Sequence, residues 1–227
     1  KQKRLGETLV KELQELGVTA SMDEFGYVIG RIPSNTTKRV PRIALVAHMD
    51  TSPDASGKDI KPRIVEKYDG GVIVLNPQQH IHLDPAVFPS LLRHIGSDLI
   101  VTDGTTLLGA DDKLGIAIIM NLVEAFQLSN DLPHGEVVVV FTPDEEVGRG
   151  TDYLDLKKVN ADFGYTLDGS RVGEIAYENF NAAKAVLQFH GKSVHPGSAK
   201  NKMVNALRLA MERSEEHTSE LQSRQVI

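Results

Sequence analysis

The stretches that decide the fold are RIALVAH (residues 42–48) and EVVVVFT (residues 136–142). Each is an almost continuous apolar run, which is typical of a strand buried on both faces. Between them, residues 113–126 have the pattern of a buried helix, and DFGYTL (162–167) follows as a third buried strand. Strands and helices that alternate in this way predict an α/β fold, with a mostly parallel sheet and helices on both of its faces.

The flanking segments extend this pattern. Leucines recur at helical spacing from Leu5 to Leu16, and Gly17 ends the predicted helix. FGYVIGRI (25–32) is predicted to be a strand, and a hairpin is expected near residues 64–76. The character changes after about residue 182, where AKAVLQFHG (183–191) indicates a strand and residues 202–212 a helix. A second domain could therefore begin at about residue 182.

Both ends of the chain predict a truncated sequence. The first helix begins almost at residue 1 without an initiator methionine, so we expect residues upstream of it. At the other end, RSEEHTSELQS (213–223) matches one reading frame of a common sequencing adapter. We interpret residues 213–227 as a non-native tail rather than as a charged terminal helix, and we exclude His217 from any site.

Composition excludes several classes of protein. The 227 residues are 41% hydrophobic and 25% charged, as in an ordinary globular protein, with a net charge of −6 and no basic block that would indicate nucleic-acid binding. No apolar run is long enough to span a membrane, and no signal peptide is visible. Because the chain has no cysteine, a metal would have to be held by His, Asp and Glu. The lack of cysteine also fits a reducing compartment, so a cytoplasmic location is expected.

Four short segments place acidic or histidine residues directly after a strand or between a strand and a helix. They are His48-Met49-Asp50, Gly109-Ala110-Asp111-Asp112-Lys113, Asp144-Glu145-Glu146 and Asp168-Gly169. Ligands of open α/β sheets bind outside the carboxyl ends of the strands, so these segments are expected to converge on one crevice.

The chemistry of these segments is that of a metal-dependent hydrolase. One imidazole and several carboxylates suit Zn²⁺ or a similar ion, and one carboxylate could bridge two such ions. In the pair Glu145-Glu146, one carboxylate can bind metal while its neighbour acts as general base. Asp50, two residues after His48, could orient the imidazole. Each segment alone has an ordinary explanation as a turn or a helix start, and only their combination favours a catalytic site.

Five segments resemble the peptidase T family, the aminotripeptidase branch of the co-catalytic zinc exopeptidases. They are HMDTSPDASGK, DGTTLLGADDKLG, FTPDEEVGRG, YTLDGSRVGEIAYENFNAA and SVHPGSAKNKMVNAL. The similarity extends from about residue 5 to Met211. It implies that residues 1–181 form an incomplete zinc-exopeptidase catalytic domain and that residues 182–212 begin its α+β lid domain.

The resemblance also implies a set of metal ligands. His48 and Asp168 would bind one Zn²⁺, Glu146 would bind a second, and Asp111 would bridge the two ions of each intact subunit. The family has a fifth ligand, a histidine near its C-terminus, which this chain does not contain. An inactive fragment is therefore one alternative for the chain as it stands.

Further residues receive roles from the same resemblance. Glu145 would be the general base and Asp50 would orient the His48 ring. The peptide bond between Asp111 and Asp112 would be cis, and His195 on the lid would bind substrate or stabilise the oxyanion.

The implied activity is that of a cytoplasmic hydrolase of peptide catabolism. It would release the N-terminal residue of short peptides, chiefly tripeptides, through attack of a metal-activated hydroxide. The alternatives are a related N-acyl-amino-acid deacylase or dipeptidase with the same centre, and a non-catalytic metal-binding scaffold. No nucleic-acid or membrane partner is expected.

Overall fold

The computed structural model describes residues 2–129, 132–169, 171–178 and 186–217. Its helices and strands follow the chain in the order α1 (Gln2–Glu15), β1 (Thr19–Met22), β2 (Val28–Ile32), β3 (Ile43–His48), β4 (Arg63–Val65), β5 (Ile73–Asn76), β6 (Ile81–Leu83), η1 (Pro89–His94), β7 (Leu99–Val101), α2 (Ala110–Leu128), β8 (Val137–Thr142), η2 (Glu145–Val147), α3 (Leu156–Val159), β9 (Phe163–Thr166), η3 (Pro196–Ser198) and α4 (Ala206–His217). None of the described helices is both long and apolar enough to cross a membrane.

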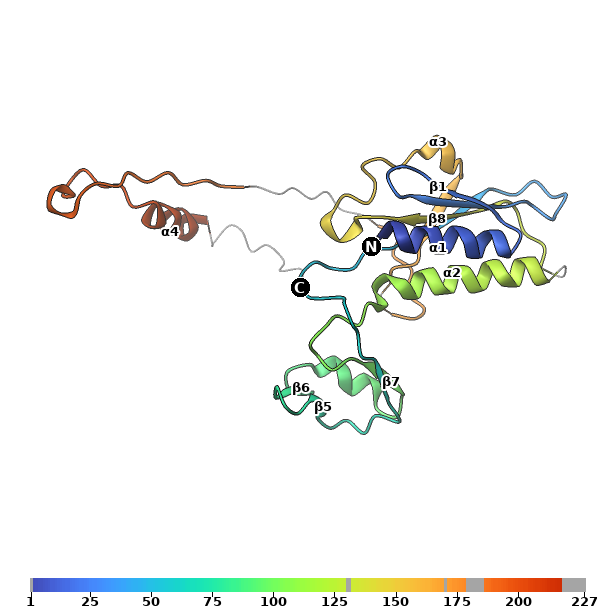
Figure 1. Cartoon of the computed structure of the whole chain (residues 1–227), viewed down its shortest axis with the longest axis horizontal. Coiled ribbons are helices and arrows are strands. Elements are labelled where there is room, and N and C mark those ends of the chain that lie inside the picture. The colour runs from blue at the N-terminus through green and yellow to red at the C-terminus, as the bar shows by residue number, and fades with distance from the viewer. Residues whose placement is uncertain (1, 130–131, 170, 179–185, 218–227) are drawn as a thin grey trace. The chain divides into compact units, whose positions relative to one another are not determined.

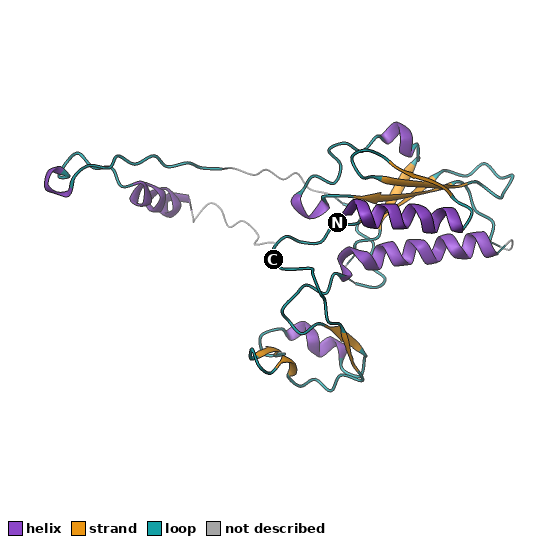
Figure 2. Ribbon diagram, viewed as in Figure 1, coloured by secondary structure: helices purple, strands orange, loops and turns teal. Residues whose placement is uncertain are grey.

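The central element is a five-stranded sheet in the order β1-β2-β8-β3-β9 (Figure 2). Strands β8, β3 and β9 are parallel neighbours, whereas β2 runs antiparallel to both β1 and β8. Four strands of this sheet therefore share one direction, and the predicted α/β fold with a mostly parallel sheet is confirmed. The register pairs His48 with Thr142 and Val46 with Thr166, so β3, β8 and β9 end at the same edge.

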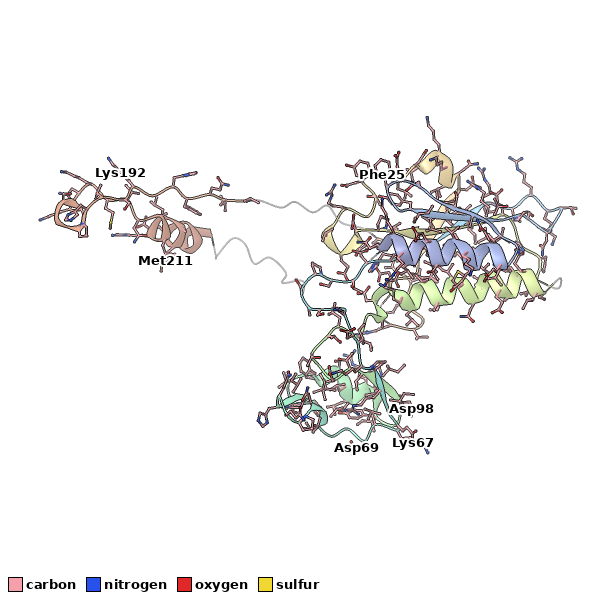
Figure 3. All side chains as sticks on the ribbon, in the orientation of Figure 1. Phe25, Lys67, Asp69, Asp98, Lys192 and Met211 are labelled. Atoms are coloured by element: carbon pink, nitrogen blue, oxygen red, sulfur yellow. The ribbon has the colours of Figure 1, made fainter. Side chains whose placement is uncertain are left out.

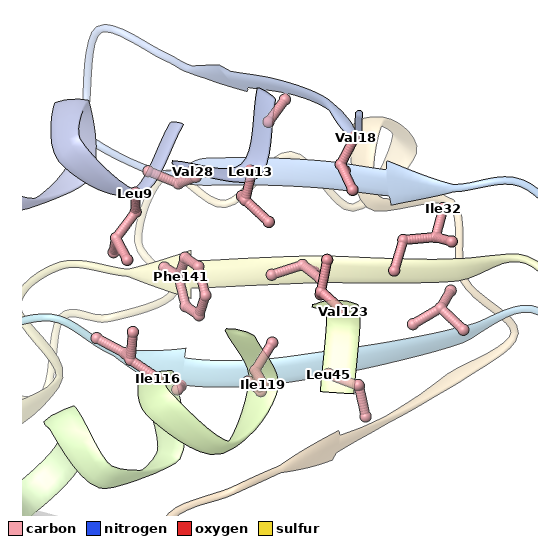
Figure 4. Close-up of a cluster of buried hydrophobic side chains, with 14 of the residues drawn as sticks. Leu9, Leu13, Val18, Val28, Ile32, Leu45, Ile116, Ile119, Val123 and Phe141 are labelled. Atoms are coloured by element: carbon pink, nitrogen blue, oxygen red, sulfur yellow. The ribbon is translucent and has the colours of Figure 1, made fainter. Parts of the chain in front are cut away.

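The core explains why the two apolar runs became the central strands. Every residue of β8 is buried, and β3 is buried on both faces. Helices α1 and α2 pack on one side of the sheet, and the short helix α3 lies on the other (Figure 1). Figure 4 shows the larger cluster, in which Leu13 of α1 and Ile119 of α2 contribute side chains to the same core as Phe141 of β8.

Truncation of Phe141 should destabilise the chain strongly. Its ring is fully buried in the cluster between the sheet and the two long helices. Phe141→Ala removes that ring and leaves a cavity, so we expect the free energy of unfolding to fall by about 3–5 kcal/mol. Urea denaturation followed by circular dichroism measures this loss. The matched control is Phe88→Ala, because Phe88 is 47% exposed; an equal loss in both variants would contradict the described core.

The start of α2 differs from a regular helix. Asp111 and Asp112 have non-helical backbone angles, so regular helical geometry begins at Lys113, where the sequence predicts it. The peptide bond between the two aspartates is cis, as the family resemblance implies.

Three expectations about strands need correction. Strand β9 forms as predicted, but its residues are exposed because it lies at the end of the sheet and pairs there only with β3. The hairpin expected near residues 64–76 does not form, because β4 pairs with β7 and β5 with β6. In the predicted strand 183–191, residues 186–191 form no strand and residues 183–185 lie outside the described part. Apolar alternation indicates an extended segment but does not specify its partner.

The chain divides into two compact units, Lys1–Ile175 and Ala176–Ile227. The predicted boundary at residues 181 and 182 lies outside the described residues, so the domain assignment stays a prediction. Helix α4 extends to His217 and thus into the segment interpreted as a non-native tail. Residues 218–227 of that tail also lie outside the described part.

Candidate metal centre

Side chains from separate strand ends meet around His48. The imidazole is nearly buried at the end of β3, and its Nε2 atom lies 2.8 Å from Oδ1 of Asp111 at the start of α2. The same nitrogen is 3.8 Å from Oδ2 of Asp168, which follows β9, and 3.9 Å from Oε2 of Glu145, which follows β8. The predicted convergence of the four segments on one edge of the sheet is therefore present in the structure.

Among the described residues there are two groups of potential ligands, and within each group the donor atoms lie within 4.8 Å of one another. One consists of His48, Asp111 and Glu146, and the other of His48, Asp112 and Asp168. These groups contain all four residues that were predicted to bind metal. They also contain Asp112, for which no ligand role was predicted. The individual ligand assignments stay predictions.

Asp112 is already engaged with the backbone. This buried carboxylate accepts hydrogen bonds from the N–H groups of His48 and Gly115, both at 3.1 Å. A side chain at Gly115 would overlap this carboxylate and the carbonyl oxygen of Leu167, so the position requires glycine. Asp112 thus joins the end of β3 to the start of α2. The sequence holds no signal that separates the role of Asp112 from that of Asp111, because the bond to His48 joins positions that are 64 residues apart.

Lys113 is a second group whose contact was missed. Its Nζ donates a hydrogen bond of 2.9 Å to the carbonyl oxygen of Asp50. Burial lowers the pKa of this amine, while the surrounding carboxylates, beginning with Asp50, act in the opposite direction. Lys113 therefore places a positive charge beside an otherwise acidic centre.

Asp50 contacts both the histidine and the glutamates. Its Oδ1 lies 3.3 Å from Nδ1 of His48, beside the ring that it was predicted to orient. Its two oxygens also accept hydrogen bonds of 3.0 Å from the backbone N–H groups of Glu145 and Glu146. This second contact was not anticipated, and it makes Asp50 a direct link between the end of β3 and the turn η2.

Burial and mutual repulsion shift the carboxyl groups toward protonation. Burial raises the pKa of Asp112 to about 6, with a further contribution from Asp168. Burial also raises the pKa of Glu145 and of Asp168, and nearby carboxylates add to both shifts. Burial alone would lower the pKa of His48, but its hydrogen bond to Asp111 and the charges of Asp168 and Asp50 raise it overall.

This donor set fits a divalent cation. The buried Nδ1 atom of His48 has no hydrogen-bond partner among the described residues, and Nε2 faces carboxylate oxygens. Several carboxylates surround a single imidazole, and Lys113 offsets only part of their charge. A cation held by imidazole and carboxylate ligands would compensate the rest, and this ligand chemistry suits Zn²⁺.

Metal binding should therefore release protons. A cation favours deprotonated ligands, whereas the raised pKa values keep part of the metal-free centre protonated. We expect affinity for Zn²⁺ to fall as the pH is lowered through the range in which His48 and Asp112 take up protons, with more protons released near pH 6 than near pH 8. Calorimetry in buffers of different ionisation enthalpy measures this release. An affinity independent of pH across that range would contradict the described electrostatics.

His195 belongs to the other unit. It precedes the short turn η3, where its Nδ1 accepts a hydrogen bond of 3.2 Å from the N–H group of Gly197. The structure describes this local contact within the unit Ala176–Ile227, whereas His48 belongs to the unit Lys1–Ile175. The predicted contact of His195 with substrate stays a prediction.

The fold and the centre together define a class, that of α/β proteins with a cluster of histidine and carboxylate side chains, able to hold a metal ion, at the carboxyl ends of parallel strands. A sequence profile of peptidase family M20/M25/M40 matches residues 102–225, which is more than half of the chain. The chain belongs to this family.

Individual relatives agree with this assignment. Peptidase T of Desulfitobacterium hafniense (strain DSM 10664 / DCB-2) is 54% identical over 212 residues, which cover 93% of this chain and 52% of that protein. Peptidase T of Clostridium acetobutylicum is 51% identical over 213 residues, with the same two coverages. The chain thus spans about half the length of the curated relatives that it matches.

Solved structures show the same fold. The aminopeptidase PepT from Bacillus cereus ATCC 10987 superposes with a TM-score of 0.62 and 27% identity, over 92% of this chain and 50% of that one. A tripeptidase from Staphylococcus aureus gives a TM-score of 0.60 at 23% identity, over 92% and 49% of the two chains, and this likeness concerns the fold alone.

Proposed function

We propose that this chain carries the metal-binding half of an aminopeptidase that releases the N-terminal residue of tripeptides. The observation that carries the proposal is the convergence of His48 with carboxylates from two other strand ends and from the start of α2. The similarity of the chain to proteins named Peptidase T supports the choice of substrate. The absence of cysteine supports a reducing compartment, and we assign the activity to peptide catabolism in the cytoplasm.

Two Zn²⁺ ions would be held by the residues that face one another in the centre. We assign His48 and Asp168 to the first ion and Glu146 to the second, with Asp111 shared between them. The contact of Asp111 with His48 supports the shared position, as does the charge of Asp111, which adds to the effect of burial in raising the pKa of Asp168. When bound, such a pair of ions polarises the scissile carbonyl and lowers the pKa of a water molecule.

Glu145 is the proposed general base. Its side chain is half-exposed and extends toward His48, whereas Glu146 is the member of the pair that groups with two other potential ligands. The raised pKa of Glu145, caused first by burial and then by Asp168, suits a group that accepts and returns a proton near neutral pH. It would take a proton from the attacking water and deliver it to the leaving amine.

Two residues are proposed to support these steps. Asp50 holds the His48 ring and, through its contacts with the N–H groups of Glu145 and Glu146, the backbone that carries the base. His195 would contact the substrate and stabilise the oxyanion that develops at the scissile carbonyl.

A substrate panel tests the function. The chain, and the complete protein encoded by its gene, are incubated with Zn²⁺ and with tripeptides, dipeptides and N-acyl-amino acids. We expect release of the N-terminal residue from tripeptides, loss of this activity on chelation and its return with Zn²⁺. Hydrolysis confined to dipeptides or to N-acyl-amino acids would contradict the proposed substrate, and no hydrolysis by the zinc-loaded complete protein would contradict the enzyme itself.

A further inference from the structure

We propose that the N-terminal part of the chain positions the proposed catalytic base. The segment concerned is the glutamate loop, defined as residues 143–153, which carries Glu145 and Glu146. Tyr27 directly precedes β2, and Phe25 lies in the turn before that strand. Together with Gln2 of α1, they act as positioning residues for this loop. The inference rests on the proposed function, because it concerns how the base of that reaction is held.

The first contact is made by Tyr27. Its side chain is almost completely buried, and its hydroxyl oxygen accepts a hydrogen bond of 3.3 Å from the backbone N–H of Tyr153 at the end of the glutamate loop. The tyrosine is itself fixed, because the turn before it is organised by Asp23. One carboxylate oxygen of Asp23 accepts hydrogen bonds from the N–H groups of Phe25, Gly26 and Tyr27.

The second contact is an aromatic stack at the surface. The rings of Phe25 and Tyr153 are parallel within 5°, with centroids 4.4 Å apart. Phe25 lies at the surface of its unit (Figure 3), and both rings are about half exposed. Two exposed aromatic rings that stack in this way gain attraction without being part of the core, so the stack joins the turn of residues 23–27 to the loop.

The third contact fixes the other end of the loop. Gln2 donates a hydrogen bond of 2.8 Å from Nε2 to Oδ1 of Asp144, and its Oε1 accepts one of 3.3 Å from the Asp144 N–H. Asp144 has a positive φ of 56° and directly precedes Glu145. The amide side chain of Gln2 thus holds the residue whose backbone sets the direction of the base.

The loop between these anchors is internally bonded. The N–H of Gly148 donates to the carbonyl oxygen of Glu145 at 2.7 Å, and the N–H of Arg149 donates to that of Asp144 at 2.9 Å. Gly150 packs against the Cα atom of Glu145, where an added Cβ would lie at 3.2 Å. Anchoring the two ends therefore restrains the whole loop, whose inner side is held by Asp50.

The loop that carries Glu145 is thus held from the inside by Asp50 and from the outside by the contacts of Gln2, Phe25 and Tyr27. The Glu145 side chain is half-exposed and makes few contacts that could restrain it, so its position depends on its backbone. Displacement of a catalytic group by about 1 Å can reduce turnover by up to about a hundredfold. None of the outer contacts touches a proposed metal ligand, so their effect on the reaction should pass through loop position.

Three tyrosine variants test the proposal. Tyr153→Ala removes the stack but keeps the backbone N–H, Tyr27→Phe removes only the hydroxyl acceptor, and Tyr153→Phe keeps both the ring and the N–H. The matched control is Tyr68→Phe, because Tyr68 is as buried as Tyr27 and its hydroxyl donates a hydrogen bond of 2.7 Å to the carbonyl oxygen of Gly71, a residue outside the glutamate loop.

The kinetic result separates positioning from general stability. In the complete protein we expect Tyr153→Ala to lower kcat about tenfold with KM changed less than about twofold, Tyr27→Phe to act in the same direction, and Tyr153→Phe to keep the wild-type kcat. An unchanged kcat in Tyr153→Ala, or an equal loss in Tyr68→Phe, would overturn the proposal.

A second readout does not depend on peptidase activity. The 227-residue chain is titrated with Co²⁺, whose visible absorption reports the geometry of its ligands, including Glu146. We expect Tyr153→Ala to weaken Co²⁺ binding about tenfold and to alter the spectrum, with Tyr153→Phe and Tyr68→Phe like the wild type. Identical titrations for all variants would overturn the proposal. A wild-type protein that binds Co²⁺ but hydrolyses no peptide would instead contradict the proposed function.

Discussion

Glu145→Gln is expected to abolish turnover while leaving metal binding intact. The amide keeps the size of the side chain but cannot accept a proton from water, and removal of a general base typically costs about 10²- to 10⁴-fold in rate. The backbone N–H of Glu145, which Asp50 binds, is unchanged in the variant. Zinc content by elemental analysis and tripeptide hydrolysis by the complete protein measure the two properties.

Glu146→Gln is the matched control for this prediction. Glu146 groups with His48 and Asp111 as a potential ligand, so its replacement should weaken metal binding as well as turnover. Metal loss in Glu145→Gln with retention in Glu146→Gln would mean that the two roles are exchanged. Near-normal turnover in Glu145→Gln would refute its assignment as the base.

Asp50→Ala is expected to have the second largest effect. The buried carboxylate accepts hydrogen bonds from two backbone N–H groups of the glutamate loop, so its loss leaves both of them without their acceptor. The substitution also removes the carboxylate that lies 3.3 Å from Nδ1 of His48. We expect affinity for Zn²⁺ to fall about 10- to 100-fold and the free energy of unfolding to fall by about 2–4 kcal/mol. Zinc titration and urea denaturation measure these changes.

The control for Asp50 lies four residues further along the chain. Asp54 is exposed, and Asp54→Ala removes the same number of atoms and the same charge without touching the glutamate loop. It should leave zinc affinity within about twofold of the wild type. Equal effects of the two substitutions would mean that net charge, rather than the contacts of Asp50, determines binding.

The parts of the fold that are buried on both faces could be predicted, because burial requires apolar residues there. The runs 43–48 and 137–142 are apolar because both faces of β3 and β8 are covered, and their adjacency follows from the parallel α/β pattern. The pairing of β4 with β7 was not predictable in the same way. Each of these strands is three residues long, and 33 residues lie between Val65 and Leu99. Nothing in such short segments specifies a partner.

The part of the site that lies at the ends of strands could be predicted from the sequence. His48, Asp111, Glu145 and Asp168 come together because β3, β8 and β9 end at one edge, next to the start of α2. The contacts of Asp112 and of Tyr27 were not predictable, because each joins a side chain to a backbone N–H group that is distant in sequence. Such bonds depend on how the loops pass one another, which residue types and spacing do not encode.

The most direct test of the metal centre is anomalous diffraction at the zinc absorption edge, from crystals of the chain grown with Zn²⁺. We predict an anomalous peak within coordination distance of Nε2 of His48 and a carboxylate oxygen of Asp111, with Asp168 as a further ligand. A wild-type crystal with no peak at this position, or with zinc bound only elsewhere, would contradict the claim that the four strand-end segments form a metal centre.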